Sequence, residues 1–131
     1  MILRAFLSLI LEYIWIMKIK RFDIWIANLE PANQSEPDKT RPVVVVQNDM
    51  INNLNHTSFV VCPISSQNRS NNGILRVFVK AIKSNGLTKD SYILTDQLRA
   101  IDINRLQDKI GEIDAKTIEK VLQGIKIVLD I

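Results

Sequence analysis

One segment limits the possible folds more than any other: four consecutive valines at residues 43–46, which follow Arg41 and Pro42. A short apolar run of β-branched residues between polar segments predicts a strand buried on both faces. Proline fixes its own φ and pushes the preceding residue to an extended conformation, so we expect Arg41 in a polar loop edge at the mouth of this strand. A guanidinium on a rigid element suits phosphate binding, although an arginine before a strand is more often a surface ion-pair partner.

The rest of the chain predicts short strands and one helix. Apolar and polar residues alternate at 22–27 and 75–80, as in half-buried strands, and Asn85-Gly86 signals a turn. Helical spacing begins behind Asp114, which is a good N-cap. Further strands are expected at 58–64, 91–98 and 109–113. This order predicts a mainly β fold with a C-terminal α-helix, in which the helix packs on a small, strongly bent barrel.

The composition restricts the chemistry that the chain can support. The 131 residues fit one domain, and the net charge of +3 permits an anionic partner without demanding one. The single cysteine, Cys62, lies in an apolar run and is expected in the core. The single histidine, His56, has no second His or Cys at metal-ligand spacing, and no glycine-rich phosphate-binding motif is present. We therefore expect neither a metal nor another cofactor.

Residues 1–16 form an apolar extension that differs from the rest of the chain. The segment is short for a membrane span, contains Glu12, and has no small-residue cleavage site of the kind that signal peptides carry. Met17 opens a basic stretch followed by a strand pattern. We favour a misassigned start over a membrane anchor, with the domain at residues 17–131, and expect no stable membrane association.

Several ordered motifs together resemble the MazF/PemK toxins of bacterial toxin–antitoxin systems. They are, in order, the loop with Ser35 and Glu36 and the segments RPVVVVQND, CPISSQ, DSYILTDQLRAID and NRLQDKIGEID, followed by a helix. The resemblance covers residues 17–129. It implies an SH3-like barrel, a cytoplasmic homodimer, and a sequence-specific, metal-independent endoribonuclease. Such toxins cut single-stranded RNA, typically mRNA, and are neutralised by an antitoxin protein.

The resemblance also implies roles for individual residues. Arg41 and Ser65 fall on the catalytic positions, where Ser65 replaces the usual threonine. The remaining positions, expected to bind the substrate, are Ser35, Glu36, Gln67, Gln97 and Arg99. The chain departs from the family at Phe22, where glycine is usual, and at residues 37–39, where the loop normally carries a glycine.

RNA supplies its own nucleophile, the ribose 2′-OH, so an enzyme can act by positioning that hydroxyl and stabilising the developing charge. Arg41 is expected to stabilise the transition state and Ser65 to hydrogen-bond the phosphate or relay a proton. A guanidinium hardly deprotonates, which leaves the general base unassigned. Trp25 could stack on a base or pack within the sheet. Two alternatives stay open: a CcdB-like gyrase poison, and a barrel that binds RNA or protein without catalysis.

Overall fold

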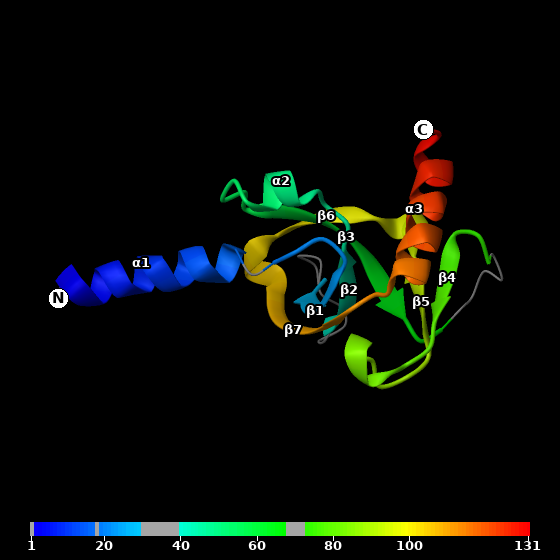
Figure 1. Ribbon diagram of the computed structural model, residues 1–131, viewed down its shortest axis with the longest axis horizontal. Helices are drawn as coiled ribbons and strands as arrows, with labels where there is room; N and C mark the ends of the chain where they lie inside the picture. The colour runs from blue at the N-terminus through cyan, green and yellow to red at the C-terminus, as the bar shows by residue number, and fades with distance from the viewer. Residues whose placement is uncertain (1, 18, 30–39, 68–72) are drawn as a thin grey trace.

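The computed structural model describes residues 2–17, 19–29, 40–67 and 73–131, with the backbone alone for residues 12–17. Figure 1 shows helix α1 projecting from a curled sheet, with the C-terminal helix lying against that sheet. The helices are α1 (Ile2–Met17), α2 (Asp49–Asn52) and α3 (Ala115–Leu129), and the short 3-10 helices are η1 (Lys83–Asn85), η2 (Thr95–Gln97) and η3 (Ile103–Arg105). The strands are β1 (Asp23–Asn28), β2 (Thr40–Val45), β3 (Ser58–Ser65), β4 (Arg76–Val79), β5 (Ser91–Leu94), β6 (Arg99–Asp102) and β7 (Leu106–Glu112).

All the strand pairs are antiparallel, in the order β4-β5-β3-β2-β1-β7, with β6 paired to β3 outside this path. Strand β3 is shared between two partners, because residues 58–61 pair with β6 and residues 64–65 pair with β5. Among the described residues no ladder joins β4 to β7, so the barrel-like sheet stays open there. This arrangement confirms the expected mainly β fold with a C-terminal helix.

The valine run lies between two hydrophobic cores. Val44 and Val46 belong to a core that includes Val121 of α3, whereas Val43 and Val45 face a second core around Trp25 and Phe59. Residues 43–46 are all buried, as a strand covered on both faces requires. The alternation fixes the register of β2, because a slip of one residue would exchange the two faces.

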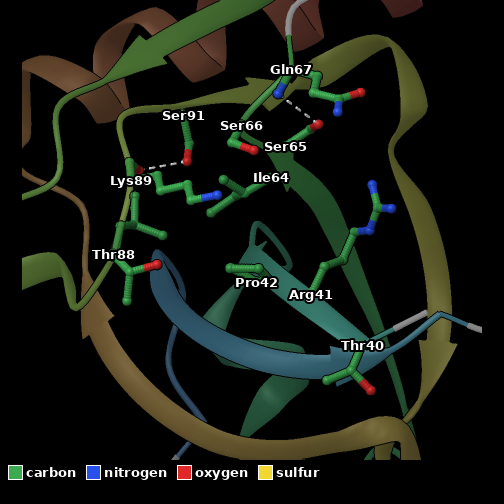
Figure 2. Close-up of a pocket in the computed structure, with 11 residues that line it drawn as sticks. Thr40, Arg41, Pro42, Ile64, Ser65, Ser66, Gln67, Thr88, Lys89 and Ser91 are labelled. Carbon is green, nitrogen blue, oxygen red and sulfur yellow. Dashed lines mark hydrogen bonds between the residues drawn. The ribbon is translucent and has the colours of Figure 1, made fainter. Parts of the chain in front are cut away.

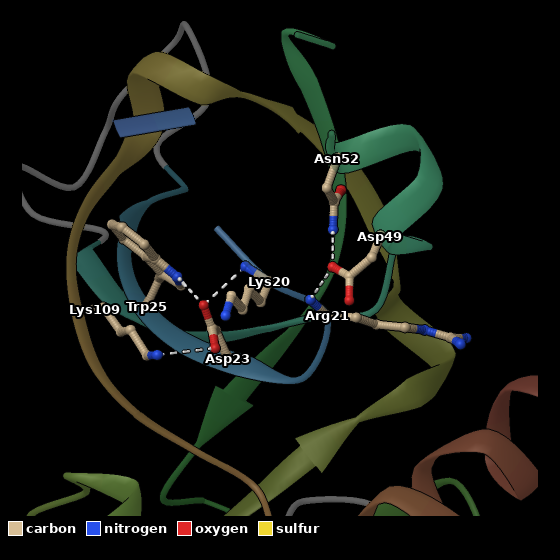
Figure 3. A network of polar contacts seen from close by, with 7 residues as sticks. All are labelled: Lys20, Arg21, Asp23, Trp25, Asp49, Asn52 and Lys109. Atoms are coloured by element: carbon tan, nitrogen blue, oxygen red, sulfur yellow. Dashed lines mark hydrogen bonds and ion pairs between the residues drawn. The ribbon is translucent and has the colours of Figure 1, made fainter. Parts of the chain in front are cut away.

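The start of β1 is held by a polar network (Figure 3). The buried Asp23 carboxylate accepts hydrogen bonds from Lys20 N (2.9 Å) and Trp25 Nε1 (3.2 Å), and it pairs with Lys109 Nζ at 3.2 Å. Phe22, where the family usually has glycine, adopts a φ of 72°. The departure therefore falls on a left-handed backbone position, which glycine adopts without steric cost.

Three strand predictions need correction. Strand β2 already begins at Thr40, so Arg41 lies inside the sheet, opposite Ala27, and not in a loop edge. The strand predicted at 91–98 ends at Leu94 and continues as η2, and strand β6 was not predicted. Strand β7 starts at Leu106, three residues before the predicted position. Asp114 caps α3 as predicted, accepting a hydrogen bond from Thr117 N at 2.8 Å.

Helix α1 was not predicted as a helix. Its large apolar side chains between Ile2 and Leu11 are exposed, up to 88% at Ile2. Among the described residues, none of the helices combines the length and apolar character needed to cross a bilayer.

Candidate active site

A pocket of ≈ 390 Å³ opens at the ends of β2 and β3 and beside the segment before β5 (Figure 2). Hydroxyl, amide and cationic side chains supply most of its polar lining. Its described lining residues are Thr40, Arg41, Pro42, Ile64, Ser65, Ser66, Gln67, Leu87, Thr88, Lys89 and Ser91. The pocket therefore contains both residues predicted as catalytic, Arg41 and Ser65, and one predicted to bind substrate, Gln67.

Strand register explains why Arg41 and Ser65 come together. The β2–β3 ladder pairs Val45 with Val61 and Val43 with Pro63, and Arg41 and Ser65 lie two residues beyond the latter pair. Because side chains alternate along a strand, both residues project on the face that Val43 and Pro63 share. Two residues 24 positions apart in the sequence thus meet in one pocket.

The Ser65 hydroxyl is oriented by the backbone. Its Oγ accepts a hydrogen bond from Gln67 N at 3.1 Å, and the side chain is only half-buried (Figure 2). Since the hydroxyl accepts this bond, its own proton is available to donate into the pocket. Such an arrangement can bind a phosphate oxygen or give a proton to a leaving oxygen.

The charge of the pocket is positive. Arg41 and Lys89 lie on opposite sides of it, with Ser65 and Gln67 along the wall between them (Figure 2). The described lining contains no Asp or Glu, and neither cation has an ion-pair partner within the described part of the chain. Two cations with no ion-pair partner among the described residues, beside several hydroxyl donors, suit an anionic ligand such as a phosphodiester.

Lys89 was missed by the sequence analysis, together with Thr88 and Ser91. The backbone around Lys89 is fixed, because Ser91 Oγ donates to the Lys89 carbonyl at 2.8 Å and Asp90 Oδ1 accepts from Ala81 N at 2.8 Å. A basic residue next to a turn is a weak sequence signal. Only the pairing of β5 with β3 shows that this one reaches the pocket.

The other predicted site residues lie elsewhere. Gln97, predicted inside a strand, lies beyond the end of β5 and is exposed in η2, and Arg99 is exposed in β6, paired with Val61. Neither lines the pocket. Ser35, Glu36 and the departures at residues 37–39 fall outside the described residues. Asp96, next to Gln97, forms a two-bond ion pair with Arg76, at 2.9 and 3.0 Å.

The structure resolves the alternatives for three further residues. Trp25 is only 2% exposed and packs in a core, so the stacking role considered for it is wrong. Cys62 is a core residue as predicted, and its burial raises the pKa of the thiol to about 12. His56 is exposed, in keeping with a solvated loop position. Among the described residues, no cluster of three or more His, Cys, Asp or Glu side chains could bind a metal ion.

A curled antiparallel sheet with a C-terminal helix and an anion-binding pocket at its strand ends defines a small barrel protein of the MazF-like toxin fold. The family model described as the PemK-like, MazF-like toxin of type II toxin–antitoxin systems matches residues 20–129. The chain belongs to this family.

Its relatives are similar along nearly their whole lengths. Endoribonuclease EndoA of Bacillus subtilis (strain 168) is 38% identical over 113 residues, which cover 86% of this chain and 96% of the relative. Endoribonuclease MazF of Staphylococcus saprophyticus is 37% identical over 112 residues, which cover 85% of this chain and 91% of the relative. The solved Mycobacterium tuberculosis toxin MazF-mt6 has 27% identity and a TM-score of 0.67, covering 83% of this chain and 97% of its own. MazF of Deinococcus radiodurans has a TM-score of 0.70, and the match covers 86% of this chain and 97% of its own. Because its identity is only 18%, this likeness supports the fold alone.

Proposed function

We propose that this chain is the toxin of a type II toxin–antitoxin pair and acts as a sequence-specific endoribonuclease on single-stranded RNA, chiefly mRNA. One observation carries the proposal: Arg41 and Ser65 share a pocket that bears two cations and no carboxylate among its described lining residues. The relatives named endoribonucleases EndoA and MazF support it.

The proposed mechanism uses the 2′-OH of the substrate as nucleophile, without a metal ion. Arg41 binds the scissile phosphate with its fork of donors and stabilises the charge that develops in the transition state. Ser65 donates its free proton to a phosphate oxygen or to the departing 5′ oxygen, while Gln67 N–H holds the hydroxyl in place. The products carry a 2′,3′-cyclic phosphate and a 5′-hydroxyl. The general base stays unassigned, because a guanidinium does not give up its proton.

The RNA extends beyond this pocket. Lys89, on the far side from Arg41, contacts a phosphate next to the scissile one. Gln97 of η2 and Arg99 of β6, both exposed, contact the RNA further along its path, as the family resemblance implies. Ser35 and Glu36 belong to the same proposed binding surface.

The proposed partners are a cognate antitoxin protein and a second copy of this chain. Among the structures of similar fold are an endoribonuclease in complex with its cognate antitoxin from Mycobacterial species and a MazE–MazF structure from Deinococcus radiodurans. By analogy, the antitoxin occupies the RNA-binding surface, and the toxin is a homodimer. We assign toxin function to residues 17–131 and place the protein in the cytoplasm, where mRNA is found. A monomeric mass in light scattering at micromolar concentration would contradict the dimer.

The alternative of a CcdB-like gyrase poison is not favoured. A gyrase-binding protein needs neither Arg41 nor Ser65, and the sequence relatives found are named endoribonucleases.

The mechanism is tested by substitutions of the two residues. Arg41→Ala should lower the cleavage rate by about a hundredfold or more, as expected for a deleted transition-state donor. Arg41→Lys should restore little, because a point charge does not replace a bidentate fork. Ser65→Ala should slow cleavage, whereas Ser65→Thr should be tolerated. Arg4→Ala, which removes an exposed arginine of α1, is the matched control and should cut at the wild-type rate.

The substrate supplies a second test. A 2′-deoxy nucleotide at the mapped cut site should block cleavage, and EDTA should have no effect. Continued cutting of the deoxy substrate would eliminate the internal nucleophile. Equal loss of activity in Arg41→Ala and Arg4→Ala would remove the assigned role of Arg41.

A further inference from the structure

A row of side chains crosses four strands at the level of Ser65. Ser65 of β3 is paired with Tyr92 of β5, and Tyr92 is paired with Phe78 of β4. The β2–β3 ladder ends at the Val43–Pro63 pair, and its continuation by two residues brings Arg41 of β2 to the level of Ser65. Directly paired residues of antiparallel strands share a face, with Cβ atoms about 4.5–5.5 Å apart. The row thus presents a guanidinium, a hydroxyl and two aromatic rings in succession.

The aromatic end of this row borders a second cavity, of ≈ 400 Å³. Phe78 and Tyr92 meet edge to face, with ring centroids 5.6 Å apart and an interplanar angle of 64°. Phe78 is 53% exposed although it lies inside a strand. Helix α3 contributes Lys120 and Gln123 to the same cavity.

These groups together have the chemistry of a nucleotide site. Unpaired bases stack on aromatic side chains, and an edge-to-face pair leaves ring surface free for such stacking. The Gln123 amide offers both donors and an acceptor for the edge of a base. Lys120 has no ion-pair partner among the described residues and can bind a phosphate. Arg76, in contrast, is engaged by Asp96.

We propose that this cavity is a nucleobase subsite, in which a base near the scissile phosphate stacks on Phe78 and Tyr92 and is contacted by Gln123. The inference rests on the proposed function, because the row connects the aromatic pair to Arg41 and Ser65. Neighbouring strands lie about 4.8 Å apart, so the two rings stand one and two strand spacings from Ser65. A strand of RNA held at Ser65 can reach them with an adjacent nucleotide. Because Ser65 of the cationic pocket is paired with Tyr92 of this cavity, RNA is favoured over an apolar segment of a protein as the occupant.

The test uses an RNA oligonucleotide that carries a 2′-deoxy group at the mapped cut site and 2-aminopurine at one neighbouring position at a time. Stacking quenches 2-aminopurine, so wild-type protein should quench it at one position near the cut. Phe78→Leu should abolish this quenching and weaken binding about tenfold, a typical cost of losing one stacked base. Phe78→Tyr should retain both properties. Phe6→Leu makes the same change at an exposed phenylalanine of α1 and should behave as wild type.

A second variant guards against a merely structural effect. Gln123→Ala changes an exposed side chain of α3 and should alter the preference for the base at the quenched position without lowering the melting temperature. Thermal unfolding of each variant provides the comparison.

The possible results separate the two proposals. Cleavage by wild type with no quenching at any position, and with unchanged binding by Phe78→Leu, would overturn the subsite and leave the nuclease. If no RNA is cleaved, so that no cut site can be mapped, binding and quenching of an unmodified RNA that carries 2-aminopurine would support the subsite and contradict the nuclease. No RNA binding at all would overturn both. If Phe78→Leu keeps its RNA affinity but loses binding to the antitoxin protein, the cavity is a protein-docking site and the proposal is wrong.

Discussion

Substitution of Phe22 tests how this chain accommodates a bulky residue at a left-handed backbone position. Phe22 is fixed there from two sides, because its N–H donates to Val45 O at 2.6 Å and its carbonyl accepts from Ile113 N at 3.1 Å. These bonds join β1 to β2 and to the residue before the Asp114 cap. The surrounding structure therefore imposes the conformation on a residue that does not favour it.

The expected effect follows from comparing two truncations. Phe22→Ala and Phe22→Gly both remove the packing of the ring on the core and its contact with the Arg21 guanidinium, which lies 4.7 Å from the ring centroid. Both should therefore be less stable than wild type. Alanine at this position pays about 1–2 kcal/mol for the left-handed conformation, which glycine avoids. Glycine in turn loses about 0.4–1 kcal/mol of stability, because its unfolded chain has more conformational freedom. The free energy of unfolding of Phe22→Gly should therefore exceed that of Phe22→Ala by about 1 kcal/mol, which corresponds to a melting temperature roughly 4 °C higher.

The assay is thermal and urea unfolding of both variants, with a matched pair at Glu119, an exposed position inside α3. There the order should reverse, because alanine is about 1 kcal/mol better than glycine in a helix interior. Phe22→Ala at least as stable as Phe22→Gly would refute the reasoning, since backbone strain would then not contribute.

Three further predictions concern other parts of the chain. Lys89→Ala should raise the KM for RNA several-fold and make the KM depend less on salt concentration, whereas Lys116→Ala, at an exposed lysine of α3, should change neither. Equal slopes of KM against salt concentration for wild type and Lys89→Ala would contradict phosphate binding by Lys89. Removal of residues 1–16 should leave folding and RNA cleavage intact, and an insoluble or inactive product would exclude the domain assignment. Hydrogen bonds from Thr117 hold the pKa of Asp114 below its ordinary value. The ionised Asp114 therefore stabilises the folded protein fully at pH values above the pKa that Asp114 has in the unfolded chain, and this stabilisation is lost as the pH falls through the lower pKa of the folded protein. Asp114→Asn should therefore flatten the acid decline in melting temperature, and an unchanged pH profile would count against this role.

Local signals in the sequence predict part of the fold well. The valine run and the cap at Asp114 depend on neighbouring residues, and both are confirmed. The break after β5 depends instead on distant contacts. Thr95 donates from both its backbone N and its Oγ1 to Leu75 O, at 3.0 and 2.6 Å, and packs against Gly124 of α3. A Cβ at position 124 would lie 2.6 Å from Thr95 Oγ1. Nothing near residue 95 in the sequence reveals this helix contact, so the strand was predicted too long.

The candidate site likewise contains residues that the sequence predicts and residues that only distant contacts bring to it. Arg41 and Ser65 were predicted through the family resemblance, and strand pairing brings them into one pocket. Lys89 reaches that pocket only through β5, and Phe78 and Tyr92 align with Ser65 only through the registers of two ladders. Such neighbours come from pairing between segments distant in sequence, which periodicity within one segment does not encode.

The division of the valine run between two cores also bears on how the chain tolerates changes in length. The separation of Arg41 and Ser65 depends on the register of β2 against β3, which burial on both faces of residues 43–45 fixes. At the start of the connection between these strands, Val46 N donates to Val60 O and the Gln47 side chain bonds to Ser58 O and Val60 N, which supports the same register. The tip of the connection, at Leu54, Asn55 and His56, is exposed. Insertions at this tip should therefore be accepted without moving the guanidinium relative to the hydroxyl, whereas one residue added inside β2 would direct Arg41 to the opposite side of the sheet.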